Sequence, residues 1–524
     1  MKIILLIIIN LIINLIITSG SIKAQWIDAY IPDFKVNDDN INSYQTNSQI
    51  GVDTAGNFTI VWRDVRQHPQ EQYPANIYCQ RYNKDGLVLG SNFIIGQDTV
   101  SAPRIIVLSD GRFIVLWLRV YNESIDYYEF YFQRFSNNGQ PLGTPLRVID
   151  TAFIASSVPP AGYCISSDSL GRFVVCWSKG NDAFDTPNIY FQRFDSTGAR
   201  LGTIDSVTDG NSIAEFPDLA MNKDGSFVIT WQDDRNSLQT GFDIYLQKFD
   251  LNGNKIGSNI KVNSDNTVQL YRGGQKISTN GKNKLVITWN DPRNCSLGEI
   301  FYQVYDSNNI VIGINRKANT SNCNIGTGVV NTSMRIDGNF VIYWSDWNLS
   351  GREQIFTRRF NNIGNPVGNQ YMVSANSPAG TTQRADNIKL FNDKVYSTWT
   401  DDRNGGTNNY DIYCNVRGFQ NPDTVIGISN ISETVKEYRL YPAYPNPFNP
   451  ETTIKYQISK NNTNVKITVY DIKGSEIEIL YNNYQNTGVH NIKWNAVNFS
   501  SGIYFIELQT STGYREIQKA VLIK

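Results

Sequence analysis

A short apolar strand that ends in tryptophan recurs seven times along the chain. In the first copy Phe58, Ile60 and Trp62 face one way, and later copies carry apolar residues on both faces. The seven tryptophans are Trp62, Trp117, Trp177, Trp231, Trp289, Trp344 and Trp399, at intervals of 55, 60, 54, 58, 55 and 55 residues. Such a period is typical of a repeat architecture, and the pattern predicts core strands buried on both sides.

Each tryptophan strand is accompanied by three further predicted strands. A second strand begins 11 to 15 residues after each tryptophan, at Ile77, Phe130, Ile189, Ile244, Ile300, Ile355 and Ile412. In the first six repeats a polar glycine turn and a short strand follow, such as residues 259–263, and a short strand such as residues 217–221 precedes the tryptophan strand. Four strands in about 55 residues fit a propeller blade better than an immunoglobulin sandwich of about 100 residues. We therefore predict an all-β protein with a seven-bladed β-propeller over residues 25–419.

The two ends of the repeat region indicate how the ring closes. After Phe419 the seventh repeat lacks the turn and the fourth strand found in the other six. Residues 33–37 form an orphan copy that resembles residues 259–263 and has no repeat before it. We predict that residues 33–37 are the outer strand of the last blade.

The first residues read as a targeting segment. Lys2 precedes an apolar run from Ile3 to Ile17, and small and polar residues lead to Ala24. The run falls short of the roughly 20 residues that span a bilayer. We expect residues 1–24 to be a signal peptide cleaved close to Ala24, and no transmembrane span in the mature chain.

Composition and charge exclude several function classes. The chain has 47 Lys plus Arg against 48 Asp plus Glu, so it offers no positive surplus to hold nucleic acid. Aromatic residues make up 12% and charged residues 18%, which suits strands joined by turns. His68 and His490 are the only histidines, which argues against a histidine triad or a histidine-rich metal site. We expect no metal and no cofactor.

The C-terminal region differs from the repeats. Residues 420–437 read as a linker, and residues 438–524 show about seven short alternating strands, which predict a small immunoglobulin-like β-sandwich. Three strings mark this region: YPNPFNP, VYDIKG and SSGIYF. Their characteristic residues, with the basic last residue, are Tyr444, Pro445, Asn446, Pro447, Phe448, Asn449, Pro450, Tyr470, Gly474, Gly502, Tyr504 and Lys524.

In order and spacing these strings resemble the type A C-terminal sorting domain of the type IX secretion system of Bacteroidota and relatives. The resemblance implies export through the periplasm and across the outer membrane, with the type IX machinery as a partner. It further implies a mature protein that is attached to the cell surface or released. The repeats themselves are similar to uncharacterised secreted repeats. This resemblance implies an architecture but no particular activity.

Four repeats carry an aspartate two residues, and an arginine four residues, after the tryptophan. The pairs are Asp64 with Arg66, Asp233 with Arg235, Asp291 with Arg293, and Asp401 with Arg403. We favour a structural interpretation, in which these residues satisfy loop backbone groups and pair across neighbouring blades. The alternative is a polar ring that grips a sugar or a peptide. Trp347 lies beyond the tryptophan strand of its repeat and is a better binding candidate than the seven core tryptophans.

Six cysteines could form disulfides in an exported protein. Cys164 and Cys176 flank a turn that brings them nearly opposite one another, so a cross-strand bond is expected. Cys295 and Cys323 are predicted on two loops of the same face, within one blade's reach. Cys79 and Cys414 hold matching positions in adjacent blades, too far apart to bond.

The function that these features favour is a binding module for an extracellular glycan or protein. The alternatives are a carbohydrate-active enzyme (glycoside hydrolase or lyase) with carboxylates at the propeller mouth, and a structural cell-envelope protein. No local motif singles out a catalytic pair. A dedicated ligand would need an aromatic-lined pocket at one mouth of the ring, and we expect it on the face that carries the loops after the tryptophan strands.

Overall fold

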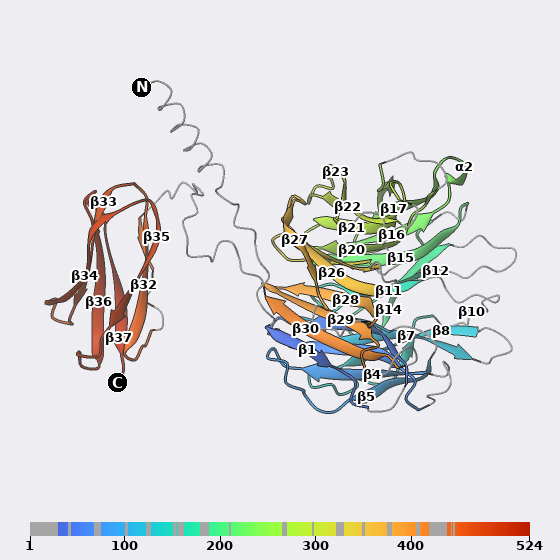
Figure 1. The fold of residues 1–524 in the computed structure, drawn as a ribbon, viewed down its shortest axis with the longest axis horizontal. Helices are drawn as coiled ribbons and strands as arrows, with labels where there is room; N and C mark the ends of the chain where they lie inside the picture. The colour runs from blue at the N-terminus through green and yellow to red at the C-terminus, as the bar shows by residue number, and fades with distance from the viewer. Residues whose placement is uncertain are drawn as a thin grey trace, which may run out of the picture. The chain divides into compact units, whose positions relative to one another are not determined.

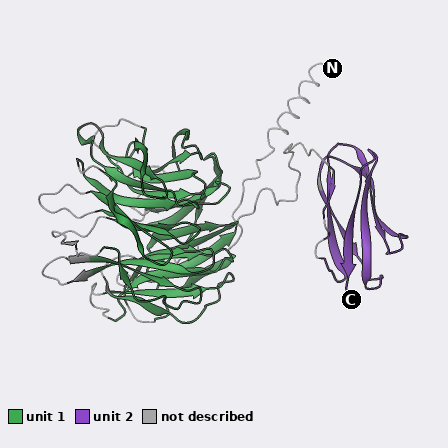
Figure 2. Ribbon diagram, turned by 180° about the vertical axis from the view of Figure 1, so that it is seen from behind, with its two compact units in different colours: residues 1–425 green, residues 426–524 purple. Residues whose placement is uncertain are grey.

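The computed structural model describes residues 30–524 except 40–42, 68–74, 100–102, 122–126, 150–152, 155–161, 179–187, 209–210, 265–269, 296–297, 321–329, 348–351, 375–379, 405–408, 419–437, 442 and 444–445. The chain forms two compact units, residues 1–425 and 426–524 (Figure 2). The boundary between them falls inside the predicted linker. The predicted signal peptide, the linker and His68 lie outside the described residues. Among the described residues, no helix is long and apolar enough to cross a membrane.

The first three groups of strands in unit 1 follow the first three repeats (Figure 1). Group 1 contains β2 (Gln45–Val52), β3 (Phe58–Asp64), β4 (Ala75–Tyr82) and β5 (Phe93–Thr99). Group 2 contains β6 (Arg104–Val107), β7 (Phe113–Tyr121), β8 (Tyr127–Phe135), β9 (Leu146–Arg147) and β10 (Phe153–Ile154). Group 3 contains β11 (Tyr163–Ser167), β12 (Phe173–Ser178), β13 (Ile189–Phe194) and β14 (Arg200–Ser206). A single pairing of β5 with β7 joins groups 1 and 2 into one sheet.

Four more groups complete unit 1. Group 4 contains β15 (Ala214–Met221), β16 (Phe227–Asp233), α2 (Ser237–Thr240), β17 (Gly241–Phe249), β18 (Lys255–Lys261) and β19 (Leu270–Tyr271). Group 5 contains β20 (Gly273–Thr279), β21 (Leu285–Asp291), β22 (Glu299–Tyr305) and β23 (Val311–Lys317). Group 6 contains β24 (Val330–Met334), β25 (Phe340–Trp347), β26 (Glu353–Phe360) and β27 (Pro366–Met372). Group 7 contains β28 (Gln383–Phe391), β29 (Lys394–Asp401), β30 (Asp411–Gly418) and β1 (Ile31–Lys35).

The apolar core lies between successive groups. Each of seven clusters of buried residues joins one group to the next, and one of them joins Trp62 of group 1 to Ile412 of group 7. The seven repeat tryptophans are at most 3% exposed, which confirms them as core residues. Sheets that pack face to face around a closed ring are the arrangement of a β-propeller.

The ring is closed by chain from both ends. Strand β1 runs antiparallel to β30, with Phe34 opposite Cys414. Beyond β1, the Val36 amide donates a hydrogen bond to the Ile412 carbonyl at 2.8 Å. The equivalent bond in group 4 joins the Val262 amide to the Ile244 carbonyl, also at 2.8 Å. The predicted outer strand is thereby confirmed, although its ladder begins at Ile31, two residues earlier than expected.

Unit 2 is a sandwich of two antiparallel sheets. One contains β31 (Arg439–Leu440), β32 (Glu451–Ile458) and β35 (Gly488–Asn495). The other contains β34 (Glu476–Gln485), β33 (Thr463–Tyr470), β36 (Gly502–Thr510) and β37 (Arg515–Leu522). Residues of both sheets, including Ile454, Trp494, Ile467 and Leu508, form one buried core. The predicted small β-sandwich is confirmed.

The cysteines correct one expectation. Cys164 and Cys176 lie directly opposite one another, as predicted, yet both are free thiols. The Cys164 sulfur contacts the Cys176 carbonyl oxygen at 3.8 Å, so the two side chains are close but not covalently joined. Cys79 and Cys414 are free, as expected. Cys295 is disulfide-bonded, and Cys323, its predicted partner, lies outside the described residues.

Candidate functional site

The first strand of each group contributes one residue to a ring at the centre of the propeller. These residues lie directly opposite the residue that precedes the repeat tryptophan. We call them the inner ring: Gln49, Arg104, Cys164, Asp218, Lys276, Asn331 and Asn387. All seven line one cavity of about 550 Å³, together with other residues of the same strands. Because every group contributes its innermost strand, this cavity is the central channel.

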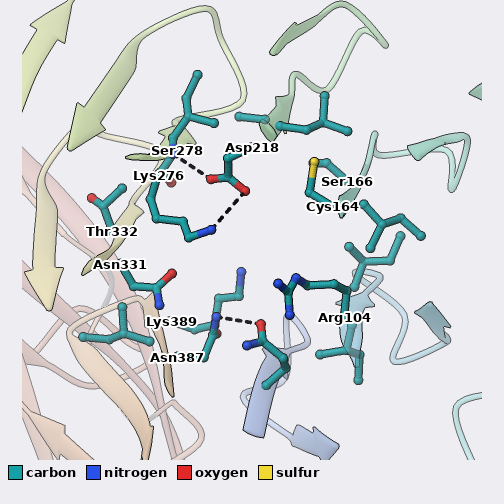
Figure 3. Close-up of a pocket in the computed structure, with 18 of the residues that line it drawn as sticks. Arg104, Cys164, Ser166, Asp218, Lys276, Ser278, Asn331, Thr332, Asn387 and Lys389 are labelled. Carbon is teal, nitrogen blue, oxygen red and sulfur yellow. Dashed lines mark hydrogen bonds and ion pairs between the residues drawn. The ribbon is translucent and has the colours of Figure 1, made fainter. Parts of the chain in front are cut away.

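Side chains in the channel tie neighbouring groups together (Figure 3). Each of these hydrogen bonds joins the inner strand of one group to that of the next: Arg104 Nε to the Tyr163 carbonyl, the Ile277 amide to Asp218, Asn331 to the Asp386 carbonyl, and Asn387 to Gln49. Inner-ring residues therefore help to hold neighbouring groups of the propeller together, and they also form the surface of the channel.

Asp386 is the most buried carboxyl of the channel. Its Oδ2 accepts hydrogen bonds from the Ser48 amide at 3.1 Å, the Ser48 hydroxyl at 2.7 Å and the Thr400 hydroxyl at 2.9 Å. Burial nevertheless raises the pKa of Asp386 to about 7, because desolvation of the charged form outweighs these hydrogen bonds.

We expect Asp386→Asn to flatten the pH dependence of stability. The folded-state pKa lies above the ordinary value of 3.8, so the proton's stabilising contribution is complete below about pH 4. This contribution to the free energy of unfolding is at most about 4 kcal/mol, and it is lost as the pH rises through about 7. Urea unfolding of wild type, Asp386→Asn and the exposed-site control Asp85→Asn between pH 4 and 8 measures this. An unchanged slope in Asp386→Asn would contradict the assignment.

The four aspartate–arginine pairs form buried clusters at the ends of the tryptophan strands. The tryptophan Nε1 donates to the aspartate Oδ2 at 2.8–3.0 Å, and the arginine amide donates to Oδ1 at 2.8–3.0 Å. Each guanidinium lies 3.9–4.2 Å from the centre of an aromatic ring on the next strand, that of Tyr78, Tyr245, Phe301 or Tyr413. These contacts lie within single groups. Arg66 also contacts Asp38, which follows β1 of group 7.

Asp233→Ala is expected to destabilise the propeller by about 3 kcal/mol. Trp231 and Arg235 would each lose a buried acceptor. Burial opposes ionisation of Asp233, yet hydrogen bonds from these two residues lower its pKa on balance. Asp110 with Arg112 has the same spacing on the surface, and Asp110→Ala should change stability by less than about 1 kcal/mol. Equal losses in the two variants, measured by chemical denaturation, would refute the structural role.

The structure separates the predicted binding residues from the channel. None of Asp64, Arg66, Asp233, Arg235, Asp291, Arg293, Asp401 and Arg403 lines the described cavity. Trp347 ends β25, is 42% exposed and does not line it either. The channel instead gathers Arg104, Lys276 and Lys389, which no motif indicated. A signal for the inner ring does exist: its residues lie 13 positions before each tryptophan, and 12 in the last repeat.

Two kinds of loop mark the two ends of the propeller. At one end the segments after the tryptophan strands bond to the segments that lead into the inner strands, as Val65 does to Tyr44 and Asp234 to Ile213. At the other end glycine turns of adjacent groups touch, as where Thr54 bonds to Ser109. This is the predicted arrangement of loops. The predicted face for a ligand remains a prediction.

The characteristic residues of unit 2 stabilise its fold. Asn446 bonds to the Lys519 carbonyl at 2.8 Å and accepts from the Val521 amide at 2.8 Å, and the buried Phe448 ring lies 5.2 Å from that of Trp494. Further contacts join Pro450 to Ala496, Tyr470 to Glu507, Tyr504 to Ser500, and Lys524 to Val497. Gly474 has a φ of 79°, which a turn glycine adopts without strain. Tyr444 and Pro445 lie outside the described residues.

Residues 442–524 match a known family, the secretion system C-terminal sorting domain. The chain is thus a β-propeller protein that carries a sorting domain for secretion. No curated protein matches the chain.

Several solved propeller and carbohydrate-active structures are similar to part of this chain. The propeller of the trilobed protease from Pyrococcus furiosus has 10% identity and a TM-score of 0.43, and covers 71% of this chain and 95% of its own. An α-L-arabinanase from Penicillium chrysogenum has 14% identity, a TM-score of 0.40 and coverages of 60% and 92%. A family PL25 ulvan lyase has 8% identity, a TM-score of 0.45 and coverages of 75% and 96%. At these scores none of them establishes a shared activity.

Proposed function

We propose that this protein is a binding module that the type IX system delivers to the cell surface or the medium, and that its propeller holds a glycan or protein ligand in the central channel. The sorting domain supports the delivery. The channel volume lies in the range of small-ligand sites, roughly 300–1,000 Å³, which supports binding.

The inner ring is the observation that carries the proposal. The seven groups repeat their core tryptophan, and four of them repeat the buried aspartate–arginine cluster. At the inner ring, by contrast, seven equivalent positions hold six different residue types, with cationic, anionic and amide groups among them. Identical packing roles favour identical residues, whereas an asymmetric ligand requires different groups around it.

A second candidate is a carbohydrate-active enzyme, and Asp386 is the observation that favours it. A carboxyl with a pKa of about 7 is suited to general acid catalysis at neutral pH. Asp386 and Asp218 already accept hydrogen bonds from neighbouring strands, however, so binding explains the channel with fewer assumptions.

Arrays of glycans and peptides probed with the full chain test this function. We expect binding that falls at least tenfold in Lys276→Glu and is unchanged in Lys282→Glu, which alters an exposed lysine outside the channel. Mass spectrometry of retained glycans separates binding from cleavage. Loss of binding in Trp347→Ala, with no loss in Lys276→Glu, would move the site to the rim and contradict the proposal.

A further inference from the structure

Three cationic side chains from three different groups converge in the channel. Arg104 comes from β6, Lys276 from β20 and Lys389 from β28, and Figure 3 shows them pointing toward one another across the cavity. Arg104 and Lys276 belong to the inner ring. The ladder places Lys389 two residues beyond Asn387 on the same strand, nearer the glycine-turn end.

Two of these cations, Lys276 and Lys389, are poorly matched by the protein's own groups, whereas Arg104 donates to backbone carbonyls. Lys276 Nζ lies 3.9 Å from Asp218, whose other carboxylate oxygen accepts the Ile277 amide. Within the described part of the chain, Lys389 Nζ has neither a hydrogen bond nor an ion pair. Burial lowers the pKa of Lys389, and the attraction of Asp218 only partly offsets this. An uncompensated cation in a cavity is unfavourable unless something else binds it.

The charge balance of the channel is positive. Three cations face two carboxyls, and burial raises the pKa of one of these, Asp386, to about 7. The walls of a concave site focus such a field on an incoming ligand. The channel therefore favours an anion.

The remaining lining groups suit a hydroxyl-rich ligand. Asn47, Asn331, Asn387, Ser278 and Thr332 also line the cavity, and four of them already take part in hydrogen bonds within the propeller. No aromatic side chain is among the described residues that line it, contrary to the aromatic-lined pocket expected for a ligand. Recognition would rest on charge and hydrogen bonds, as for an acidic sugar, and not on ring stacking.

We propose that the channel binds an acidic oligosaccharide, whose carboxylate or sulfate group lies between Lys276, Lys389 and Arg104. The proposal rests on the channel-binding function above and names its ligand class. A uronate carboxylate and a sulfate ester share the anionic oxygen atoms that ammonium and guanidinium groups bind. An acidic peptide is the competing ligand class and becomes an outcome of the test.

Calorimetric titration of the full chain with four probes of matched length tests the proposal: an oligogalacturonate, a sulfated oligosaccharide, a neutral oligosaccharide and an oligoglutamate peptide. We expect one or both acidic saccharides to bind at least tenfold more tightly than the neutral one, and added salt to weaken them. Whichever of the two binds more tightly identifies the recognised group.

Lys389→Met and Lys276→Met remove the charge and keep most of the apolar stem. Each should weaken the acidic saccharide at least tenfold, whereas Lys282→Met should bind as wild type does. Melting curves control for folding, and Lys389→Met should melt no lower than wild type because it removes an unpaired cation. If Lys389→Met fails to fold, the binding measured for Lys276→Met tests the site instead.

Other outcomes overturn the proposal in distinguishable ways. Equal or tighter binding of the neutral saccharide or of the peptide, sensitive to Lys276→Met, would refute the acidic-saccharide ligand and keep the channel-binding function. Acidic saccharide binding that neither methionine variant weakens would refute the site. No binding by any of the four probes would refute the ligand class, and the array screen would then decide the function separately.

Discussion

Deletion of residues 25–38 should lower the melting temperature of the propeller by roughly 10 °C, the largest stability loss that we expect from a short deletion. The deletion removes β1, exposes the edge of β30 and takes away Val36, which is 3% exposed. The deletion also removes two partners of the buried Asp411 Oδ1. These are the ion pair with Lys35 Nζ at 2.9 Å and the hydrogen bond from Asn37 Nδ2 at 2.7 Å. Asp411 would keep its hydrogen bond from Asn404, but the loss of the ion pair of a buried carboxylate still costs several kcal/mol.

Deletion of residues 25–29 is the matched control, because it leaves β1 in place. Differential scanning calorimetry of the two deletions and of wild type gives the comparison. Coincident melting curves for the longer deletion and wild type would contradict closure by β1. A finer probe is Asn37→Ala, which removes the acceptor of the Ile412 amide and should lower the melting temperature less than the deletion does.

Removal of residues 438–524 should abolish delivery to the surface and leave the propeller folded. Unit 2 has a buried core of its own, and no described strand of one unit pairs with a strand of the other. The truncated chain should therefore keep the melting behaviour of the propeller while its surface and medium fractions fall more than tenfold. Cell fractionation in a host with this secretion system measures the distribution.

The complementary fusion tests sufficiency. Residues 420–524 joined to an unrelated periplasmic reporter should bring that reporter to the surface or the medium. Phe448→Ala within the fusion is a useful variant, because it empties the buried site beside Trp494 and should reduce both folding of the domain and export. Retention of the unaltered fusion in the periplasm would contradict the sorting role.

The repeat strands could be predicted from the sequence because their signal is redundant. Seven tryptophans at nearly equal intervals fix strands such as β3 and β16, and the likeness of residues 33–37 to residues 259–263 located the closing strand. The same redundancy drew attention to Asp233 and its equivalents. Their repetition reflects a packing role shared by several groups, so it did not point to the channel.

The channel could not be predicted in the same way. The nearly constant offset from each tryptophan marks the position of the inner ring but does not show that this position faces the channel. Inner strands β2, β15, β20 and β28 each contain an irregularity before the inner-ring residue, which the alternation of residues along the strand does not reveal. Which residue faces the channel depends on this register and on the packing of seven separate groups. The cross-strand neighbours Cys164 and Cys176 show a related limit: register was predictable, whereas the direction of the thiol depends on the rotamer.

A crystal structure of the full chain soaked with the tightest-binding acidic oligosaccharide tests the central claim, a ligand site in the channel, most directly. The account predicts sugar density inside the inner ring, with an anionic group within hydrogen-bond distance of Lys276, Lys389 or Arg104. Density confined to the outer rim, beside Trp347 or the aspartate–arginine clusters, would contradict it.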